Sequence, residues 1–106
     1  MVVIETVVFT KQVQDLLSED EYRVLQTDLV KKPDSGVIIP KSGGIRKVRW
    51  PLKGKGKRGG LRTIYYWATE KDQLFMLLIY PKNVQDNLTP TQLKQLRKRV
   101  ENQYNG

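Results

Sequence analysis

The 106-residue chain contains no cysteine and no histidine. Without cysteine, disulfides and thiolate metal sites are excluded. Without histidine, the commonest general base and metal ligand is missing, so any catalysis must use lysine, arginine, tyrosine or carboxylates. No apolar run approaches the ~20 residues that span a bilayer, and Met1–Phe9 lacks the basic leader of a signal peptide. We therefore expect a cytoplasmic protein that makes no membrane contact.

Acidic residues are also absent from Ser35 to Thr69, where nine lysines and arginines occur. The net charge of the whole chain is +8, and much of the excess falls in this window. Such a charge favours a polyanionic partner, either nucleic acid or a very acidic protein. The nine cations are Lys41, Arg46, Lys47, Arg49, Lys53, Lys55, Lys57, Arg58 and Arg62.

The hydrophobic periodicity predicts one α+β domain over residues 1–106, with elements in the order β-α-α-β-β-β-α. We expect a small, mostly antiparallel sheet with the helices packed on one face, which leaves the other face free. The expected strands are Val2–Phe9, Ile45–Trp50, Leu61–Ala68 and Gln73–Tyr80; the expected helices are Lys11–Leu17, a second between Ser18 and Pro33, and a third after Thr89.

Two of these helices have clear start signals. Ser18 is followed three residues later by Glu21, and Thr89 by Gln92, which is the spacing of a capping box. Pro90 stands at the first position of the last helix, where its missing N–H costs nothing. Thr10 is the expected cap of the first helix.

The alternation of side chains places several cations on one face of the sheet. If Trp50 faces the core, Lys47 and Arg49 point the other way. Arg62 and Tyr66 share a face of the next strand. We expect the three cations to lie together on the free face and bind phosphates, although a solvated charged surface is the alternative. The interpretation fails if the cations are scattered, or neutralised by carboxylates from elsewhere in the chain.

The segment Lys53–Gly60 alternates cations with glycines. It lacks the spacing of a Walker A loop, so no ATP site is expected. It is either a plain hairpin loop or a contact for an RNA backbone or ribosomal RNA, through Lys53, Lys55, Lys57 and Arg58. Among the aromatics, Tyr66 is the better candidate for stacking on a base because it shares a face with Arg62, and Tyr80 is ambiguous because it ends its strand.

The segments GIRKVRW, KGKGKRGGLRTIYY and LLIYPKN, followed by a capped helix, resemble the RelE superfamily of bacterial toxins. The resemblance extends over the whole chain and is greatest to the HigB-type branch, which carries the motifs K-G-K-R-G-G-x-R-x-I-Y-Y and I-Y-x-K-N. It implies a toxin of a type II toxin–antitoxin pair that a cognate antitoxin neutralises. Such toxins cut mRNA, usually on a translating ribosome, and need no metal or cofactor. The ribose 2′-hydroxyl attacks the adjacent phosphorus.

The resemblance also assigns roles to individual residues. The two basic positions of the second strand correspond to Lys47 and Arg49, and the arginine of the third strand corresponds to Arg62. The basic position after the fourth strand corresponds to Lys82 or Asn83. Arg62 is the best candidate for stabilising a charged phosphorane, because its planar fork matches two phosphate oxygens. Lys47 or Lys82 is a candidate general base or acid.

Related toxins often have an arginine where Asn83 stands and a tyrosine near Thr89, and this sequence has neither. Lys82, Tyr66 and Tyr80 are the remaining candidates for proton transfer. Two non-catalytic alternatives stay open. One is a module that only binds RNA or the ribosome, and the other is a protein of the toxin fold that only binds its antitoxin.

Overall fold

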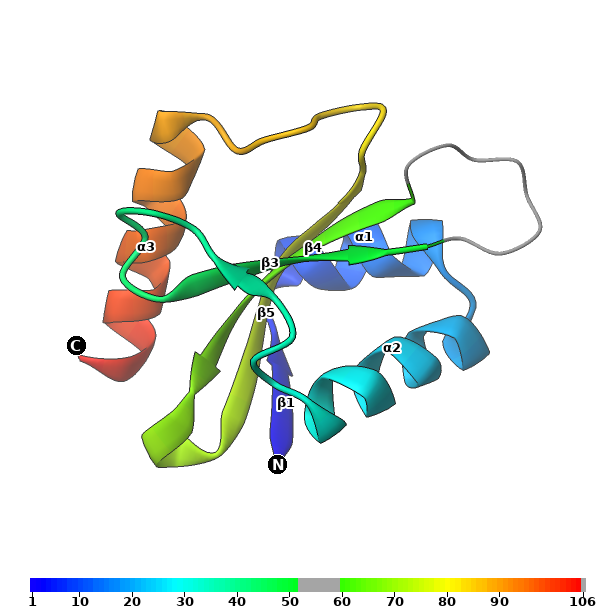
Figure 1. Ribbon diagram of the computed structural model, residues 1–106, viewed down its shortest axis with the longest axis horizontal. Helices are drawn as coiled ribbons and strands as arrows, with labels where there is room; N and C mark the ends of the chain where they lie inside the picture. The colour runs from blue at the N-terminus through cyan, green and yellow to red at the C-terminus, as the bar shows by residue number, and fades with distance from the viewer. Residues whose placement is uncertain (52–59, 106) are drawn as a thin grey trace.

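The computed structural model describes residues 1–51 and 60–105 (Figure 1). Within these residues no helix is long and apolar enough to cross a membrane. The predicted RNA contacts of Lys53, Lys55, Lys57 and Arg58 lie outside the described residues. The elements are, in chain order, β1 (Val2–Glu5), α1 (Val7–Leu16), α2 (Glu19–Lys31), β2 (Val37–Ile38), β3 (Ile45–Trp50), β4 (Leu61–Ala68), the 3₁₀ turn η1 (Thr69–Lys71), β5 (Gln73–Pro81) and α3 (Pro90–Tyr104).

The strands form a five-stranded sheet in the order β1-β5-β4-β3-β2. Among the described strands, only the pairing of β1 with β5 is parallel, and the other three pairings are antiparallel. The predicted α+β class with a mostly antiparallel sheet is confirmed. The short edge strand β2 was not among the expected strands, and its Val37 pairs with Lys47 of β3.

The first face of the sheet is covered by α1 and α2. Phe9 and Val13 of α1 and Leu25 of α2 are buried against this face, together with Leu61 and Tyr65 of β4. Leu17, Leu29, Leu74, Met76 and Ile79 complete this core. Val48 and Trp50 pack against it from β3, as the alternation predicted.

The second face is covered in part by α3, so the expectation that all helices lie on one face is wrong for this helix. Val100 of α3 is buried together with Ile64 of β4 and Phe75 and Leu77 of β5. These strand residues are almost completely inaccessible to solvent although they point away from α1 and α2. Apolar side chains on both faces of the central strands need a cover on both sides, and α3 supplies the second one.

The helix caps confirm two predictions and correct one. Ser18 and Thr89 form the expected capping boxes with Glu21 and Gln92. By contrast, β1 ends at Glu5, and the cap of α1 is Thr6, whose side chain accepts a hydrogen bond from the Phe9 backbone N–H. The run of β-branched residues therefore continues into the first turn of α1.

We predict that Tyr65→Phe destabilises the protein. The Tyr65 hydroxyl donates to the Pro33 carbonyl oxygen at 2.7 Å and accepts from the Gly36 N–H at 2.9 Å. Its loss leaves a buried donor unpaired, which costs about 1–3 kcal/mol. Urea unfolding measures the change. Tyr104→Phe, which removes a single side-chain bond to Gln73, is the control; an equal loss in the two variants would contradict the prediction.

Candidate active site

The register of the three central strands brings the predicted cations together. Arg49 of β3 lies opposite Arg62 of β4, and Lys47 lies opposite Ile64. Since Ile64 belongs to the core beneath α3, these cations are on the α3 side of the sheet, away from α1 and α2. The prediction that Lys47, Arg49 and Arg62 share one face is confirmed by this register. Together with Lys82, which directly follows β5, they are called the basic cluster here.

Arg62 is the least accessible of the three arginines in the ion pairs that the structure describes, since its side chain is 12% exposed. Its Nη2 atom lies 3.0 Å from Oδ1 of Asp86 and donates a hydrogen bond to it. Its Nε is buried and has no hydrogen-bond partner among the described residues, and the same holds for the hydroxyl of Tyr80. Tyr80 pairs with Arg62 in the register of β4 and β5. Two unpaired polar groups therefore lie on adjacent strands at the basic cluster, where a ligand could pair with them.

The segment between β5 and α3 forms one border of the cluster and is called the 82–89 loop. Asn87 Oδ1 accepts from Lys47 Nζ at 3.1 Å, while Asp86 accepts from Arg62. Gln85 donates through Nε2 to the Asn87 carbonyl oxygen and to Oε1 of Gln92, the capping residue of α3. The loop is therefore hydrogen-bonded to β3, β4 and the start of α3.

The phosphate interpretation would fail if carboxylates from elsewhere in the chain neutralised the three predicted cations. Asp86 does so for one of them. It forms an ion pair with Arg62, whereas Lys47 bonds to the neutral amide of Asn87. No ion pair joins Arg49 or Lys82 to a carboxylate within the described residues. The cluster thus contains four cations and a single paired carboxylate, and it keeps a positive excess.

The sequence-based reasoning missed Asp86 and Asn87 because they lie far from the basic window along the chain. The available signal was the antiparallel pairing of β4 with β5. Such a pairing places the residues just after Tyr80 beside the start of β4, which includes Arg62. The backbone N–H of Lys82 accordingly donates to the Gly60 carbonyl oxygen at 3.1 Å.

The electrostatics of the cluster shift two pKa values. The hydrogen bond from Arg62, with the charges of Lys82 and Lys47, lowers the pKa of Asp86 below its ordinary value of 3.8. Burial raises the pKa of Tyr80, and the positive charge of Arg62 opposes this only in part. At neutral pH the cluster therefore contains an ionised carboxylate and a protonated phenol, which can donate a proton but cannot accept one.

The other candidate residues lie apart from these contacts. Tyr66 packs against Tyr104 of α3 with ring centroids 5.6 Å apart. It is four residues along β4 from Arg62, or roughly 13 Å at the rise of a strand. Asn83 is exposed in the 82–89 loop. Base stacking by Tyr66 and RNA contact by Asn83 stay predictions.

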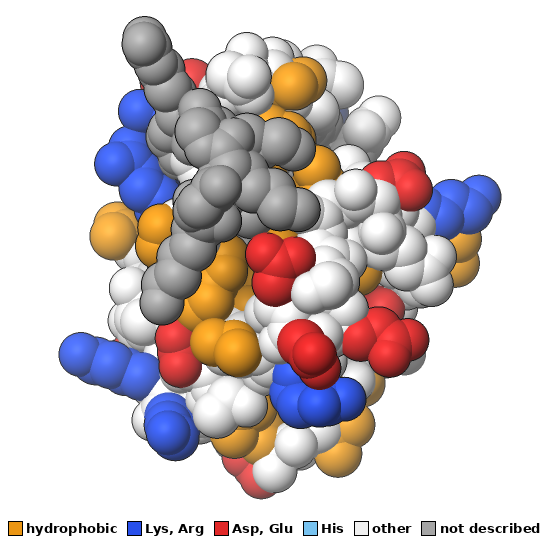
Figure 2. Space-filling view, turned by 90° about the vertical axis from the view of Figure 1, so that its right-hand side faces the viewer, with side chains coloured by type: hydrophobic (Ala, Val, Ile, Leu, Met, Phe, Trp, Pro, Cys, Tyr) orange, Lys and Arg blue, Asp and Glu red, His pale blue; other side chains and the backbone are white. Residues whose placement is uncertain are grey.

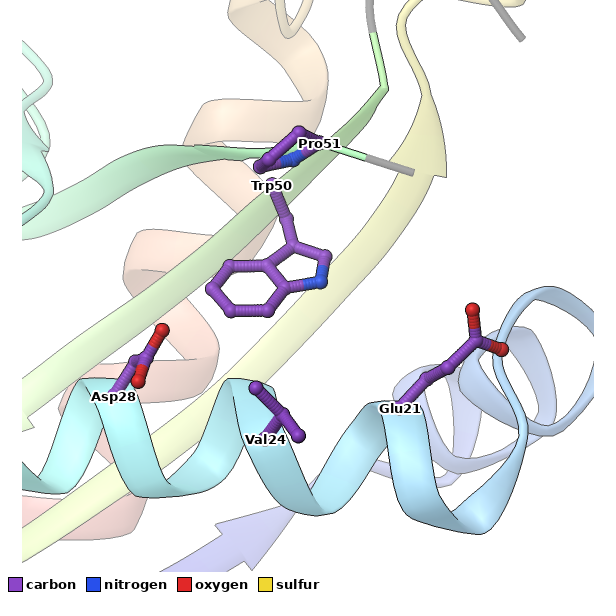
Figure 3. A pocket seen from close by; sticks show the side chains of 5 residues that line it. All are labelled: Glu21, Val24, Asp28, Trp50 and Pro51. Atoms are coloured by element: carbon purple, nitrogen blue, oxygen red, sulfur yellow. The ribbon is translucent and has the colours of Figure 1, made fainter. Parts of the chain in front are cut away.

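A groove on the first face of the sheet is a poorer match to RNA. It has a volume of about 400 Å³ and is lined by Trp50 and Pro51 at the end of β3 and by Glu21, Val24 and Asp28 of α2 (Figure 3). Figure 2 shows several acidic side chains, among basic and hydrophobic ones, on the face of the molecule that it presents. The first turn of α2 contains three acidic residues, and one of these, Glu21, lines the groove. Carboxylates repel phosphates, so we place the candidate nucleic-acid site at the basic cluster.

Two solved structures share this fold. A double arginine-to-alanine mutant of the E. coli toxin RelE in the free state matches with a TM-score of 0.57 and 16% sequence identity, over 80% of this chain and 86% of that one. The intact E. coli RelBE toxin–antitoxin complex matches with a TM-score of 0.56 and 15% identity, over 74% of this chain and 92% of the matched chain. At such identities the similarity concerns the fold.

The sequence itself identifies the family. The family model described as "RelE toxin of RelE / RelB toxin-antitoxin system" matches residues 3–105. This chain therefore belongs to the RelE toxin family, as its motifs predicted.

We predict that the Asp86 carboxyl titrates below its ordinary range and that Arg62→Gln moves its pKa upward. A carboxylate with a lowered folded-state pKa contributes stability above its unfolded pKa, and this contribution is lost as the pH falls through the folded pKa. Carboxyl carbon NMR across acidic pH measures the midpoint. Arg23→Gln removes the same charge from α2 and should leave the midpoint unchanged; equal shifts in both variants would argue against a direct pair.

Proposed function

We propose that this protein is the toxin of a type II toxin–antitoxin pair, of the HigB-like branch, and a metal-independent endoribonuclease that cleaves mRNA on the ribosome. Membership of the RelE family supports the toxin assignment, and the motifs K-G-K-R-G-G-x-R-x-I-Y-Y and I-Y-x-K-N support the branch. The observation on which the catalytic proposal depends is the position of Arg62. Its guanidinium has one unpaired N–H within a cluster of further cations, and its register partner on β5 is Tyr80, whose hydroxyl is also unpaired.

The first role of the cluster is to bind the RNA backbone. A guanidinium fork donates two parallel hydrogen bonds to phosphate oxygens, whereas lysines act as point charges. Arg62 is fixed in β4 and would hold the scissile phosphate. Arg49 and Lys47, on the neighbouring strand, would bind the same phosphate or an adjacent one. These contacts are independent of sequence, so base selection has to come from elsewhere.

Cleavage then proceeds by transfer within the RNA. The 2′-oxygen forms a bond to the adjacent phosphorus while the bond from phosphorus to the 5′-oxygen breaks, which leaves a cyclic phosphate and a 5′-hydroxyl. The 2′-hydroxyl proton passes to a base, for which Lys47 and Lys82 are the candidates. Extra negative charge develops on the phosphoryl oxygens, and Arg62 stabilises it from its fixed position.

Tyr80 is favoured over Tyr66 as the group that protonates the leaving 5′-oxygen. Tyr80 lies opposite Arg62 in the register of β4 and β5, and burial raises the pKa of its hydroxyl, so the phenol retains its proton at neutral pH. Tyr66 is instead packed against Tyr104. A phenol next to a guanidinium can donate its proton as negative charge builds on the leaving oxygen.

The partners follow from the proposed activity. The substrate is mRNA on the ribosome, with ribosomal RNA as a further contact, and a cognate antitoxin would neutralise the toxin. The solved RelBE complex, to which the chain is similar in fold, is a toxin–antitoxin assembly. Translating ribosomes place this activity in the cytoplasm.

We predict that Arg62→Ala lowers mRNA cleavage by about 10²–10³-fold, the typical cost of removing a donor that stabilises transition-state charge. The protein and the variant are expressed from a tightly controlled promoter, and new 5′-hydroxyl ends are mapped inside coding regions while growth is followed. Arg23→Ala, on α2 and outside the cluster, should arrest growth like the parent.

The outcomes of that experiment separate the alternatives. A harmless parent that leaves mRNA intact would refute the enzymatic proposal. Binding of translating ribosomes by the purified parent without any cleavage would support a non-catalytic RNA-binding module instead. Capture of the antitoxin without binding to ribosomes would support a toxin-fold protein that has no activity of its own.

We predict that Tyr80→Phe lowers the cleavage rate by about 10²-fold while RNA binding changes little, because it removes a proton donor and no charge. Single-turnover cleavage on programmed ribosomes gives the rate, and binding at equilibrium gives the affinity. Tyr104→Phe is the matched control. If cleavage by Tyr80→Phe equals that of the parent, another group protonates the leaving oxygen.

A further inference from the structure

A carboxylate occupies the position in the basic cluster where a phosphate is expected to bind. Asp86 Oδ1 accepts a hydrogen bond from Arg62 Nη2 at 3.0 Å. Three cations, Arg62, Lys82 and Lys47, act electrostatically on this carboxylate. Carboxylate and phosphate are the two anions that the guanidinium fork binds with the same geometry. The contacts of Asp86 are therefore those that a phosphate oxygen would make.

We propose that Asp86 is an internal competitor for the phosphate site: its carboxylate occupies the Arg62 guanidinium in the free toxin, and an RNA phosphate must displace it to bind. This inference rests on the proposed function, since it takes the basic cluster as the site of the RNA backbone. The inference gives the site a residue that opposes RNA binding, whereas the other residues assigned to the site promote it.

The geometry of the ion pair favours competition over a role in positioning Arg62. A carboxylate that fixes an arginine commonly accepts two parallel bonds from it. Here the described contact involves Nη2 alone, while Nε is buried and unpaired. A phosphate that replaced Asp86 could pair with both nitrogens, which would satisfy the donor that Asp86 leaves without a partner.

Asp86, rather than Arg62, is the partner that can move. The Asp86 side chain is 61% exposed and the Arg62 side chain is 12% exposed. Arg62 lies in the middle of the sheet, with β3 and β5 paired on its two sides. Asp86 belongs to a loop in which Val84 and Asn87 are also exposed. Rotation of the Asp86 side chain into solvent disturbs no residue of either core, and an ion pair whose carboxylate is exposed to solvent is weak enough to exchange.

The proposal predicts that Asp86→Asn binds RNA more tightly than the parent. The probe is a fluorescein-labelled 2′-O-methyl decaribonucleotide, which has no 2′-hydroxyl and therefore cannot be cleaved. Since an exposed ion pair is a modest competitor, we expect about a three- to tenfold lower Kd at low salt. The plot of log K against log salt should steepen by up to about one unit, because one more cation is free to neutralise a phosphate.

Matched variants separate competition from a general change in charge. Asp86→Glu keeps the carboxylate and should bind about as weakly as the parent. Asp20→Asn changes the net charge equally, and Asp20 belongs to an exposed ion pair with Arg23 on α2. Its affinity should differ from that of the parent by much less than that of Asp86→Asn. Circular dichroism and thermal unfolding establish that each variant is folded.

Two outcomes would overturn the proposal. If Asp86→Asn binds like Asp20→Asn, the carboxylate does not compete; if it binds more weakly than the parent, Asp86 positions Arg62 for RNA. The proposed binding of the RNA backbone by the basic cluster fails in a different way, when neither the parent nor Asp86→Asn binds the probe, or when Arg62→Ala binds as well as the parent. If Asp86→Asn binds the probe more tightly than the parent, and adding Arg62→Ala to this variant abolishes the gain, the competition and the role of the basic cluster are both supported.

Discussion

The candidate site depends on the packing of β4. This strand is paired with β3 on one side and β5 on the other, and it is covered on both faces. Leu61 and Tyr65 point into the core beneath α1 and α2, and Ile64 points into the core beneath α3. Arg62 shares the second face with Ile64. A rigid strand thus holds a nearly buried guanidinium with its orientation fixed by the packing around it. Such preorganisation is what a group that stabilises developing charge requires.

The site is completed by a segment that is neither strand nor helix. The 82–89 loop hydrogen-bonds to Lys47 and Arg62 through the side chains of Asn87 and Asp86, and its Gln85 bonds to the capping residue Gln92. The cap that starts α3 therefore also fixes the border of the cluster. Local capping chemistry and the electrostatics of the site are coupled through a few hydrogen bonds, so a change at the start of α3 acts on the cluster as well as on the helix.

The parts of the fold that follow from local chemistry were predictable. The capping boxes at Ser18 and Thr89 depend only on residues three positions apart, and period two places Lys47 and Arg49 on one face of β3. The register that pairs Arg49 with Arg62 extends this face to β4. The start of α1 depends on tertiary contacts. Thr6 and Thr10 are both able to cap a helix. Thr6 is the cap of α1 because its hydroxyl also donates a hydrogen bond to the Leu77 carbonyl oxygen of β5.

The errors about α3 and Asp86 have a common cause. The apolar stripe of a helix shows which of its sides is buried but not which face of a sheet receives it, so the sequence was equally compatible with either side for α3. Asp86 is 24 residues from Arg62 along the chain, and only the register of β4 with β5 brings them together. In both cases the missing information was the relative placement of elements, which composition and periodicity do not contain.

The unpaired groups beside Asp86 indicate why such a site persists in a small domain. A buried donor without a partner costs about 1–3 kcal/mol, and the cluster has two buried polar groups of this kind, Arg62 Nε and the Tyr80 hydroxyl. Repulsion among four cations adds to this cost, and one carboxylate offsets only part of it. If folding were the sole requirement, an apolar side chain in place of Arg62 would avoid this free-energy cost. The proposed anionic ligand would offset this cost, because it would pair with both groups and neutralise the remaining charge in place of Asp86.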